Sequence, residues 1–373
     1  MPRVDRLPDG TYEVRISVVD PTTGKRHQPR IRARSRRELD NAIAEARAGI
    51  LRGDVRATDA TPLREWLETW HATYRPPSDA SRFARRRSID RVMRDPIADI
   101  RLGRLKPAHI QAYIDDLSRE LSPASIRPIV ATLGMALDRA VTVERLIPVS
   151  PLAGVTIPAA PRRAMAVWSS DYAAAFLHAA EGGRFGPAWL LALMLGIRQG
   201  ELAALRWPDI DLPRRRITIR RTVTRDEDGH WQVGDVAKSG AGQRSLVLPA
   251  PCHVALTTWS AATDSERERL GDLWDAEEDA VFGDGTGRNY RATLAFWREF
   301  RRIVGTVPGL PAIRPHDLRH TAATHMIRAG VPIPTVSRIL GHASPAITMS
   351  VYAWVLDSME EHAAETIGSL YSG

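Results

Sequence analysis

The chain has 373 residues, 52 Lys and Arg against 44 Asp and Glu, and a formal net charge of +8. This length suggests two or three domains, and 43% hydrophobic with 26% charged residues is typical of a folded chain. The single cysteine, Cys252, excludes a disulfide scaffold and a cysteine-ligated zinc site, and no apolar run approaches the ~18 residues of a membrane helix. No signal-peptide core precedes the first domain, so we expect a protein of a reducing compartment with a polyanionic partner.

Residues 1–57 are predicted to form a small basic domain. Residues 11–19 alternate as a strand does, residues 20–25 form a turn, residues 28–33 return, and Ser35 caps a helix that begins near residue 36. Between residues 25 and 37 lie seven Lys or Arg and no acid. This pattern favours a DNA-contacting strand pair, and a solvated basic face is the alternative. The candidate DNA-binding residues here are Lys25, Arg26, Arg30, Arg32 and Arg34.

Residues 58–157 are predicted to form a helical domain. Helices are expected from Thr61, over residues 81–94, from about residue 106 and from Ser122, with proline or a capping residue at most of the starts. One arginine-rich side of such a bundle would suit the phosphate backbone of duplex DNA. The candidate DNA-binding residues here are Arg82, Arg85, Arg86 and Lys106.

A proline-containing linker over residues 150–164 leads into a larger α+β domain. We expect helices over residues 171–180 and 187–195 and strands over residues 216–224 and 244–248. Residues 251–304 return to helix, interrupted by an acidic surface stretch over residues 264–279.

Two local signals in this domain involve basic side chains. Arg198 lies between Gly196 and Gly200, and a rigid arginine in such a turn can clamp an oxyanion; a helix C-cap is the structural alternative. Lys238 lies near the turn of a predicted hairpin over residues 236–249. Only three of the 52 basic residues are lysine, and lysine, unlike arginine, can release a proton near neutrality. An ordinary exposed turn lysine remains the alternative.

Two further signals follow in the same domain. His316 and Arg319 are three residues apart, which places an imidazole and a fixed cation on one helix face. His342 follows a helix end, and Tyr352 comes ten residues later on another helix. For Tyr352 the structural alternative is a core aromatic with a satisfied hydroxyl.

A metal site formed by His316 and His320 is a competing interpretation. However, His320 points away from the face shared by His316 and Arg319, and Arg319 would repel a dication. No His-Glu-x-x-His motif occurs, and the candidate residues include no carboxylate cluster that could hold Mg²⁺. We therefore predict phosphoryl transfer without a metal or another cofactor, in which cations neutralise the phosphate and a tyrosine attacks it.

With these residues, the chain resembles the tyrosine recombinases of the phage integrase family. The resemblance implies a multidomain fold: a small β-sheet-plus-helix arm-binding domain (1–57), an all-α helical core-binding domain (58–157), and an α+β, mainly helical catalytic domain with a C-terminal tail helix (158–373). The motifs that carry it stand in the family's order: Gly196-Ile197-Arg198-Gln199-Gly200-Glu201-Leu202, Lys238, His316-Asp317-Leu318-Arg319-His320-Thr321, Leu340-Gly341-His342 and Tyr352.

The resemblance implies that Tyr352 is the nucleophile and forms a 3′-phosphotyrosyl link. Arg198 and Arg319 would bind the scissile phosphate, and His342 would donate a hydrogen bond to it. The other implied roles are a general base or proton shuttle for His316, a general acid for Lys238 and structural support for Glu201. Trp354 stands where many family members have a histidine, outside the implied catalytic set.

The implied activity is site-specific recombination that integrates or excises a mobile element. The implied partners are double-stranded DNA at attachment sites, three further copies of the chain in a homotetramer, and an excisionase or DNA-bending accessory protein, in the bacterial cytoplasm at the nucleoid and without a membrane. A Xer-like resolvase and a non-catalytic DNA-binding relative are the alternatives. All six active-site positions hold competent residues, which argues against the non-catalytic alternative, and the pattern around His316 argues against a type IB topoisomerase.

Overall fold

The computed structural model describes residues 4–7, 10–19, 26–28, 30–51, 61–74, 76, 78–159, 165–236, 242–289 and 292–357, together with residues 364, 368 and 371. The chain forms two compact units, Met1–Arg162 and Arg163–Gly373. The predicted domain boundaries at residues 57 and 157 remain predictions.

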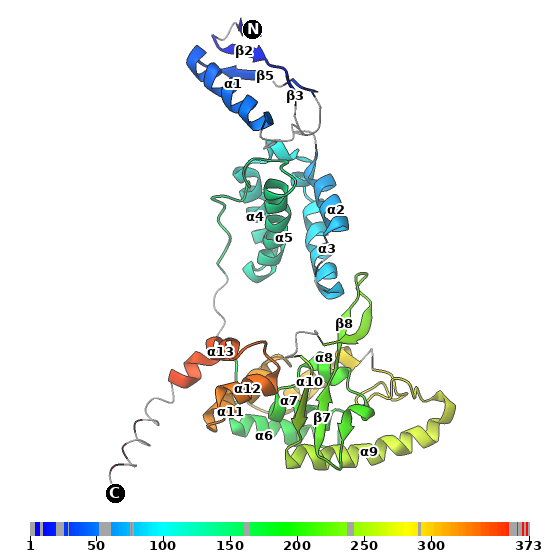
Figure 1. The fold of residues 1–373 in the computed structure, drawn as a ribbon. Helices are drawn as coiled ribbons and strands as arrows, with labels where there is room; N and C mark the ends of the chain where they lie inside the picture. The colour runs from blue at the N-terminus through cyan, green and yellow to red at the C-terminus, as the bar shows by residue number, and fades with distance from the viewer. Residues whose placement is uncertain are drawn as a thin grey trace. The chain divides into compact units, whose positions relative to one another are not determined.

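The N-terminal part of the first unit is a small antiparallel sheet covered by one helix (Figure 1). Val14, Ile16, Val18 and Leu39 form its core. The strands occur in the order β1-β2-β5, and β3 pairs with β4. The elements are β1 (Val4–Arg6), β2 (Tyr12–Arg15), β3 (Val18–Val19), β4 (Arg26–His27), β5 (Arg30–Ala33) and α1 (Arg36–Leu51).

The predicted start of α1 is confirmed. The backbone N–H of Glu38 donates to Ser35 Oγ at 3.2 Å, and the Glu38 carboxylate accepts from the backbone N–H of Arg34 at 3.2 Å. The predicted strand over residues 11–19 is interrupted between β2 and β3, and β1 was not predicted because three residues are too few to show alternation. The predicted turn over residues 20–25 lies outside the described residues.

The second part of this unit is a helical bundle, as predicted. Trp66, Leu67 and Trp70 share the buried face of the first helix, as their spacing indicates. Ser78 caps the second helix, which begins at Asp79, two residues earlier than expected. The helices are α2 (Leu63–Thr73), α3 (Asp79–Met93), α4 (Pro107–Glu120) and α5 (Pro123–Thr142), with short 3-10 turns at Pro96–Asp99 and Leu102–Arg104.

The second unit is mainly helical and carries two small sheets (Figure 1). Its core surrounds the apolar helix α7, which contacts both α9 and α11. The helices are α6 (Ser170–Ala179), α7 (Gly186–Leu195), α8 (Gln199–Ala203), α9 (Ala250–Leu270), α10 (Ala292–Thr306), α11 (Asp317–Arg328), α12 (Ile333–Leu340) and α13 (Pro345–Asp357). The strands are β6 (Ile210–Asp211), β7 (Arg216–Ile219), β8 (Arg221–Arg225), β9 (Trp231–Asp235) and β10 (Arg244–Val247).

Two predictions about the strands of this unit were wrong. The single strand expected over residues 216–224 is divided into β7 and β8, which belong to different sheets. The strands that flank Lys238 do not pair with each other, since β9 pairs with β8 and β10 pairs with β7. Alternation in sequence does not reveal such a change of partner. Lys238 therefore lies, in sequence, between strands of two different sheets.

The helix that begins at Ala250 extends into the acidic stretch and ends at Leu270. Within the described residues, no single helix is both long and apolar enough to cross a membrane; α12 and α13 pass that test only together, across a bend of 114°.

Candidate active site

Arg198 is held by a short turn between α7 and α8. Gly196 ends α7 in the left-handed conformation, with a φ of 62°. A Cβ atom on Gly196 would lie 2.5 Å from Leu340 Cδ2, and one on Gly200 would lie 2.8 Å from the Val223 carbonyl oxygen. Both positions flanking Arg198 therefore require glycine, for conformational freedom at the first and for close packing at both.

A buried carboxylate fixes the Arg198 side chain. Glu201 is 2% exposed; it accepts from the Arg198 backbone N–H at 3.0 Å and from Arg198 Nη1 at 2.8 Å. Its other partner is Arg244, which donates from Nη1 and Nη2 at 3.1 and 2.8 Å. Burial raises the pKa of Glu201, but the hydrogen bonds and charges of Arg244 and Arg198 outweigh burial and hold it below 4.5. Glu201 is therefore ionised at neutral pH.

Arg244 joins three parts of the site. Besides Glu201, its guanidinium donates to the carbonyl oxygen of Ile339 at 2.8 Å and to that of Gly242 at 3.1 Å. Ile339 lies near the end of α12, and Gly242 lies just before β10. A single buried arginine thus connects the Arg198 turn, the end of α12 and the strand that follows Lys238.

Arg319, on α11, is 4% exposed and lies beside this cluster. Its Nη1 donates to the Gly196 carbonyl oxygen at 2.7 Å. Its Nη2 is buried and has no hydrogen-bond partner in the part of the chain that the structure describes. Burial and the charge of Arg198 lower the pKa of Arg319 to about 9, so it stays protonated at neutral pH. An unpartnered, buried guanidinium nitrogen requires an acceptor, and an anion would supply one.

His342 follows Gly341, which ends α12 in the left-handed conformation with a φ of 69°. The Gly341 carbonyl oxygen accepts from Arg198 Nη2 at 3.2 Å, so the loop that carries His342 is tied to Arg198. His342 Nδ1 and Thr348 Oγ1 are 2.8 Å apart. Burial and the charges of Arg319 and Arg198 lower the pKa of His342 to about 4. The imidazole is therefore neutral at neutral pH.

Tyr352 lies within α13, at a residue with non-helical dihedral angles (φ −115°, ψ 19°). Its side chain is 1% exposed and packs with Ile327 and Leu340. Its hydroxyl lies 2.9 Å from His320 Nδ1. Burial raises the pKa of Tyr352 to about 12, although the charge of Arg319 opposes the rise. The phenol is therefore protonated at rest.

The structure brings together most of the predicted catalytic residues. Arg198, Glu201 and Arg319 meet around Gly196, His342 is tied to Arg198 through Gly341, and Tyr352 is tied to α11 through His320. His316 is exposed at the start of α11, and its ring packs edge-on against that of His320, with centroids 5.5 Å apart. Lys238 lies outside the described residues.

Sequence reasoning missed Arg244 and His320. Arg244 was a strand residue among 49 arginines, and nothing local distinguishes it from the others. The expectation that His320 points away from the face of His316 and Arg319 was wrong, because the rings of His316 and His320 pack edge-on with centroids 5.5 Å apart. The spacing gave no indication that the Tyr352 hydroxyl lies beside His320.

The predicted DNA-binding residues differ in their surroundings. Arg30, Arg32, Arg34 and Lys106 are exposed, whereas Lys25 and the side chain of Arg26 lie outside the description. Arg82 is partly exposed on α3.

Arg85 is 8% exposed and stacks on Trp70 and Tyr74, with its Cζ 4.9 and 4.5 Å from the ring centroids. Arg86 forms a bidentate ion pair with Glu68 and a second pair with Asp90. These two side chains are therefore engaged within the bundle. The neighbouring Arg87 and Arg94 are exposed and line a groove between α3 and α5.

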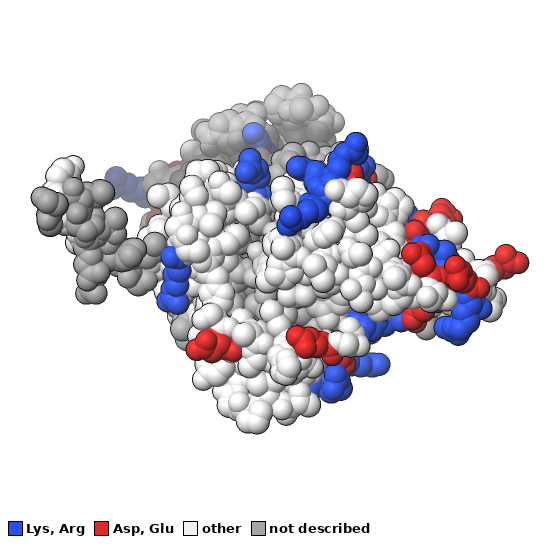
Figure 2. Space-filling model, turned by 90° about the horizontal axis from the view of Figure 1, so that it is seen from below, with Lys and Arg blue, Asp and Glu red and all other residues white. Residues whose placement is uncertain are grey.

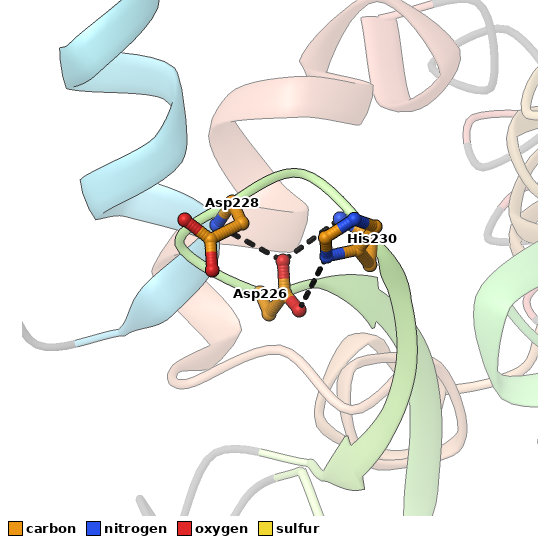
Figure 3. A group of neighbouring side chains, drawn as sticks. All are labelled: Asp226, Asp228 and His230. Carbon is orange, nitrogen blue, oxygen red and sulfur yellow. Dashed lines mark hydrogen bonds and ion pairs between the residues drawn. The ribbon is translucent and has the colours of Figure 1, made fainter.

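One group of potential metal ligands occurs among the described residues, at the turn between β8 and β9 (Figure 3). Asp226 Oδ1 accepts from the backbone N–H groups of Asp228 and His230, at 3.0 and 2.8 Å. The His230 ring lies 3.3 Å from the same carboxylate. These bonds account for the cluster as a carboxylate-stabilised turn.

The comparisons with known proteins agree with this site. Residues 178–359 match the model of the phage integrase family. The "tyrosine recombinase XerC-like" protein of Caldanaerobacter subterraneus subsp. tengcongensis is 25% identical over 96% of both chains. The integrase of transposon Tn1549, in complex with right end DNA, has a TM-score of 0.68 and 17% identity, and covers 81% of this chain and 100% of that one.

The lambda integrase tetramer bound to a Holliday junction has a TM-score of 0.53 and 19% identity, and covers 92% of this chain and 96% of that one. Both structures share the fold of the mainly helical unit with small sheets. The lambda integrase structure also shares the sheet-and-helix N-terminal part. The matched family model and the full-length relative place the chain in the phage integrase family of tyrosine recombinases, which are DNA strand-transfer enzymes.

Proposed function

We propose that this chain cuts and rejoins double-stranded DNA at attachment sites through a 3′-phosphotyrosyl link at Tyr352, and thereby integrates or excises a mobile element. The observation that carries the proposal is the buried, unpartnered Nη2 of Arg319 beside Arg198 and a buried phenol. A scissile phosphate would supply the missing acceptor. The name of the Tn1549 transposon integrase supports the assignment to a mobile element.

In this reaction Arg198 and Arg319 neutralise the non-bridging oxygens of the phosphate as negative charge develops on them. His342 is neutral, and a hydroxyl proton donated by Thr348 to Nδ1 leaves Nε2–H free to donate to the phosphate. The tyrosine oxygen bonds to phosphorus, and the 5′ oxygen leaves with a proton from Lys238. His316 acts as a general base or proton shuttle. Since one phosphodiester is exchanged for another through the tyrosyl link, no cofactor is required.

DNA contact in this proposal involves both parts of the first unit. The exposed arginines of β5 and the segment after it face arm-type sites, and the basic side of the helical bundle faces the core site. Arg87 and Arg94 join the proposed bundle contacts, and Arg85 is left out because it is buried. On the face of the molecule in Figure 2, charged side chains are scattered around a largely uncharged area, so we place the DNA elsewhere.

We further propose a homotetramer on DNA that resolves a Holliday junction, assisted by an excisionase or a DNA-bending protein. The lambda integrase tetramer, whose fold this chain shares, supports this assembly. A Xer-like resolvase of chromosome dimers remains the second candidate, because a full-length relative carries a XerC-like name.

The test uses the direct repeats that flank the gene's element as the candidate attachment site. A duplex containing this site, nicked close to the expected cut, should trap a covalent protein–DNA adduct that resists detergent. Tyr352→Phe should form no adduct, and an adduct that persists in this variant would overturn the assignment. Recombination of two plasmids that carry different attachment sites supports an integrase, whereas resolution confined to two identical sites on one dimer supports the resolvase.

A further inference from the structure

Three histidines surround the proposed reaction centre, but only one of them touches the nucleophile. His342 Nδ1 is engaged with Thr348, and His316 is exposed, with its ring packed edge-on against that of His320. His320 Nδ1 lies 2.9 Å from the Tyr352 hydroxyl. The described residues offer that hydroxyl no other hydrogen-bond partner.

The burial of Tyr352 determines the direction of this hydrogen bond. If His320 Nδ1 carried the proton and donated it, the phenolic hydrogen would be buried without an acceptor, which costs free energy. The arrangement that satisfies both groups has the phenol donating to Nδ1 and the imidazole proton on Nε2. His320 is thus already aligned to receive the phenolic proton.

The local charges are consistent with a neutral imidazole at rest. Partial burial lowers the pKa of His320, the charges of Arg319 and Arg314 lower it further, and the Asp317 carboxylate opposes them. The groups that face His320 are these three, the His316 ring from α11 and Tyr352 from α13. A phosphate bound at Arg319 would partly offset the positive charge there and favour a proton on His320.

We propose that His320 is a further catalytic residue, which aligns the Tyr352 hydroxyl and takes its proton as the tyrosine oxygen attacks phosphorus. The bond between Tyr352 Oη and phosphorus forms, the bond between phosphorus and the 5′ oxygen breaks, and the phenolic proton moves to His320 Nδ1. The 5′ oxygen receives a separate proton from the general acid. Religation reverses each transfer, so His320 returns its proton to Tyr352.

This inference rests on the proposed function, because it concerns the same cleavage step. It assigns the phenolic proton to His320, so that His316, which is open to solvent beside His320, is left as a proton shuttle. The assignment follows from contact rather than from motif position.

The test is single-turnover cleavage of the nicked attachment-site duplex by His320→Asn. The asparagine amide can place an oxygen near the position of Nδ1, so it retains an acceptor but cannot take up a proton at neutral pH. We expect a loss of roughly 10²- to 10³-fold at pH 7, within the usual range for general base catalysis, with partial recovery as pH rises. The matched control is His178→Asn, since His178 is 84% exposed on α6 and should leave the rate unchanged.

A second substrate carries sulfur in place of the bridging 5′ oxygen, so its leaving group needs no proton. Lys238→Ala should regain cleavage on this substrate, whereas His320→Asn should remain slow. Rates for His320→Asn within threefold of wild type, or full recovery with sulfur, would overturn the role of His320. If His320→Asn melts below the assay temperature, His320→Gln replaces it under the same criteria. Failure of wild type to form any Tyr352 adduct would instead refute the proposed function.

Discussion

Replacement of Arg244 by leucine should separate stability from catalysis in this site. Arg244→Leu leaves the buried Glu201 carboxylate without two charge-assisted hydrogen bonds of 2.8 and 3.1 Å. Removing one partner of a buried ion pair costs about 3–5 kcal/mol. We expect about 3 kcal/mol, at the lower end of that range, because Arg198 still donates twice to the same carboxylate. The Ile339 and Gly242 carbonyl oxygens also lose their donor.

The matched control is the double variant Glu201→Leu with Arg244→Leu, which removes both charges. Apolar replacement of a whole buried pair is often close to neutral, so the double variant should be more stable than Arg244→Leu alone. Both should lose adduct formation, because Arg198 is no longer held by a carboxylate fixed on both sides. Urea unfolding and the suicide-duplex assay measure the two effects. A loss below 1 kcal/mol in Arg244→Leu, or a double variant no more stable than Arg244→Leu, would refute this reasoning.

Three further predictions concern packing, pH and DNA contact. Gly200→Ala should lower the free energy of unfolding by about 1–3 kcal/mol, because its Cβ would lie 2.8 Å from a carbonyl oxygen of β8, whereas Gly305→Ala has open space and should be neutral or stabilising in thermal melts. Glu201 should stabilise the fold fully above pH 4.5 and progressively less as pH falls below it, since its folded pKa is lowered; urea titrations at several pH values should give a shallower acid loss in Arg244→Leu. Arg85→Leu should lower stability with little change in DNA affinity, and Arg94→Ala should reduce the salt dependence of DNA binding by about one ion.

The sequence was informative where a local rule determines the structure. The glycines around Arg198, the cap of α1 and the apolar faces of α2 and α5 follow from conformational freedom, capping and periodicity, and the structure has them as expected. The partners of strands flanking Lys238 were not predictable, because pairing depends on segments distant in the chain. The burial of Arg85 was not predictable for the same reason, because its stack on Trp70 and Tyr74 joins two helices.

The groups that hold this site in place are not all part of the sequence motifs. Arg198 and Arg319 carry like charges that oppose each other, and Glu201 alone cannot neutralise both of them and Arg244. The excess positive charge is fixed in place by backbone carbonyl oxygens at Gly196, Ile339 and Gly341. Such preorganisation spends folding free energy on a repulsion that a bound phosphate relieves. In the proposed reaction, the protonated, buried phenol beside this charge is the nucleophile at rest, and it becomes reactive when the scissile phosphate binds and a base takes its proton.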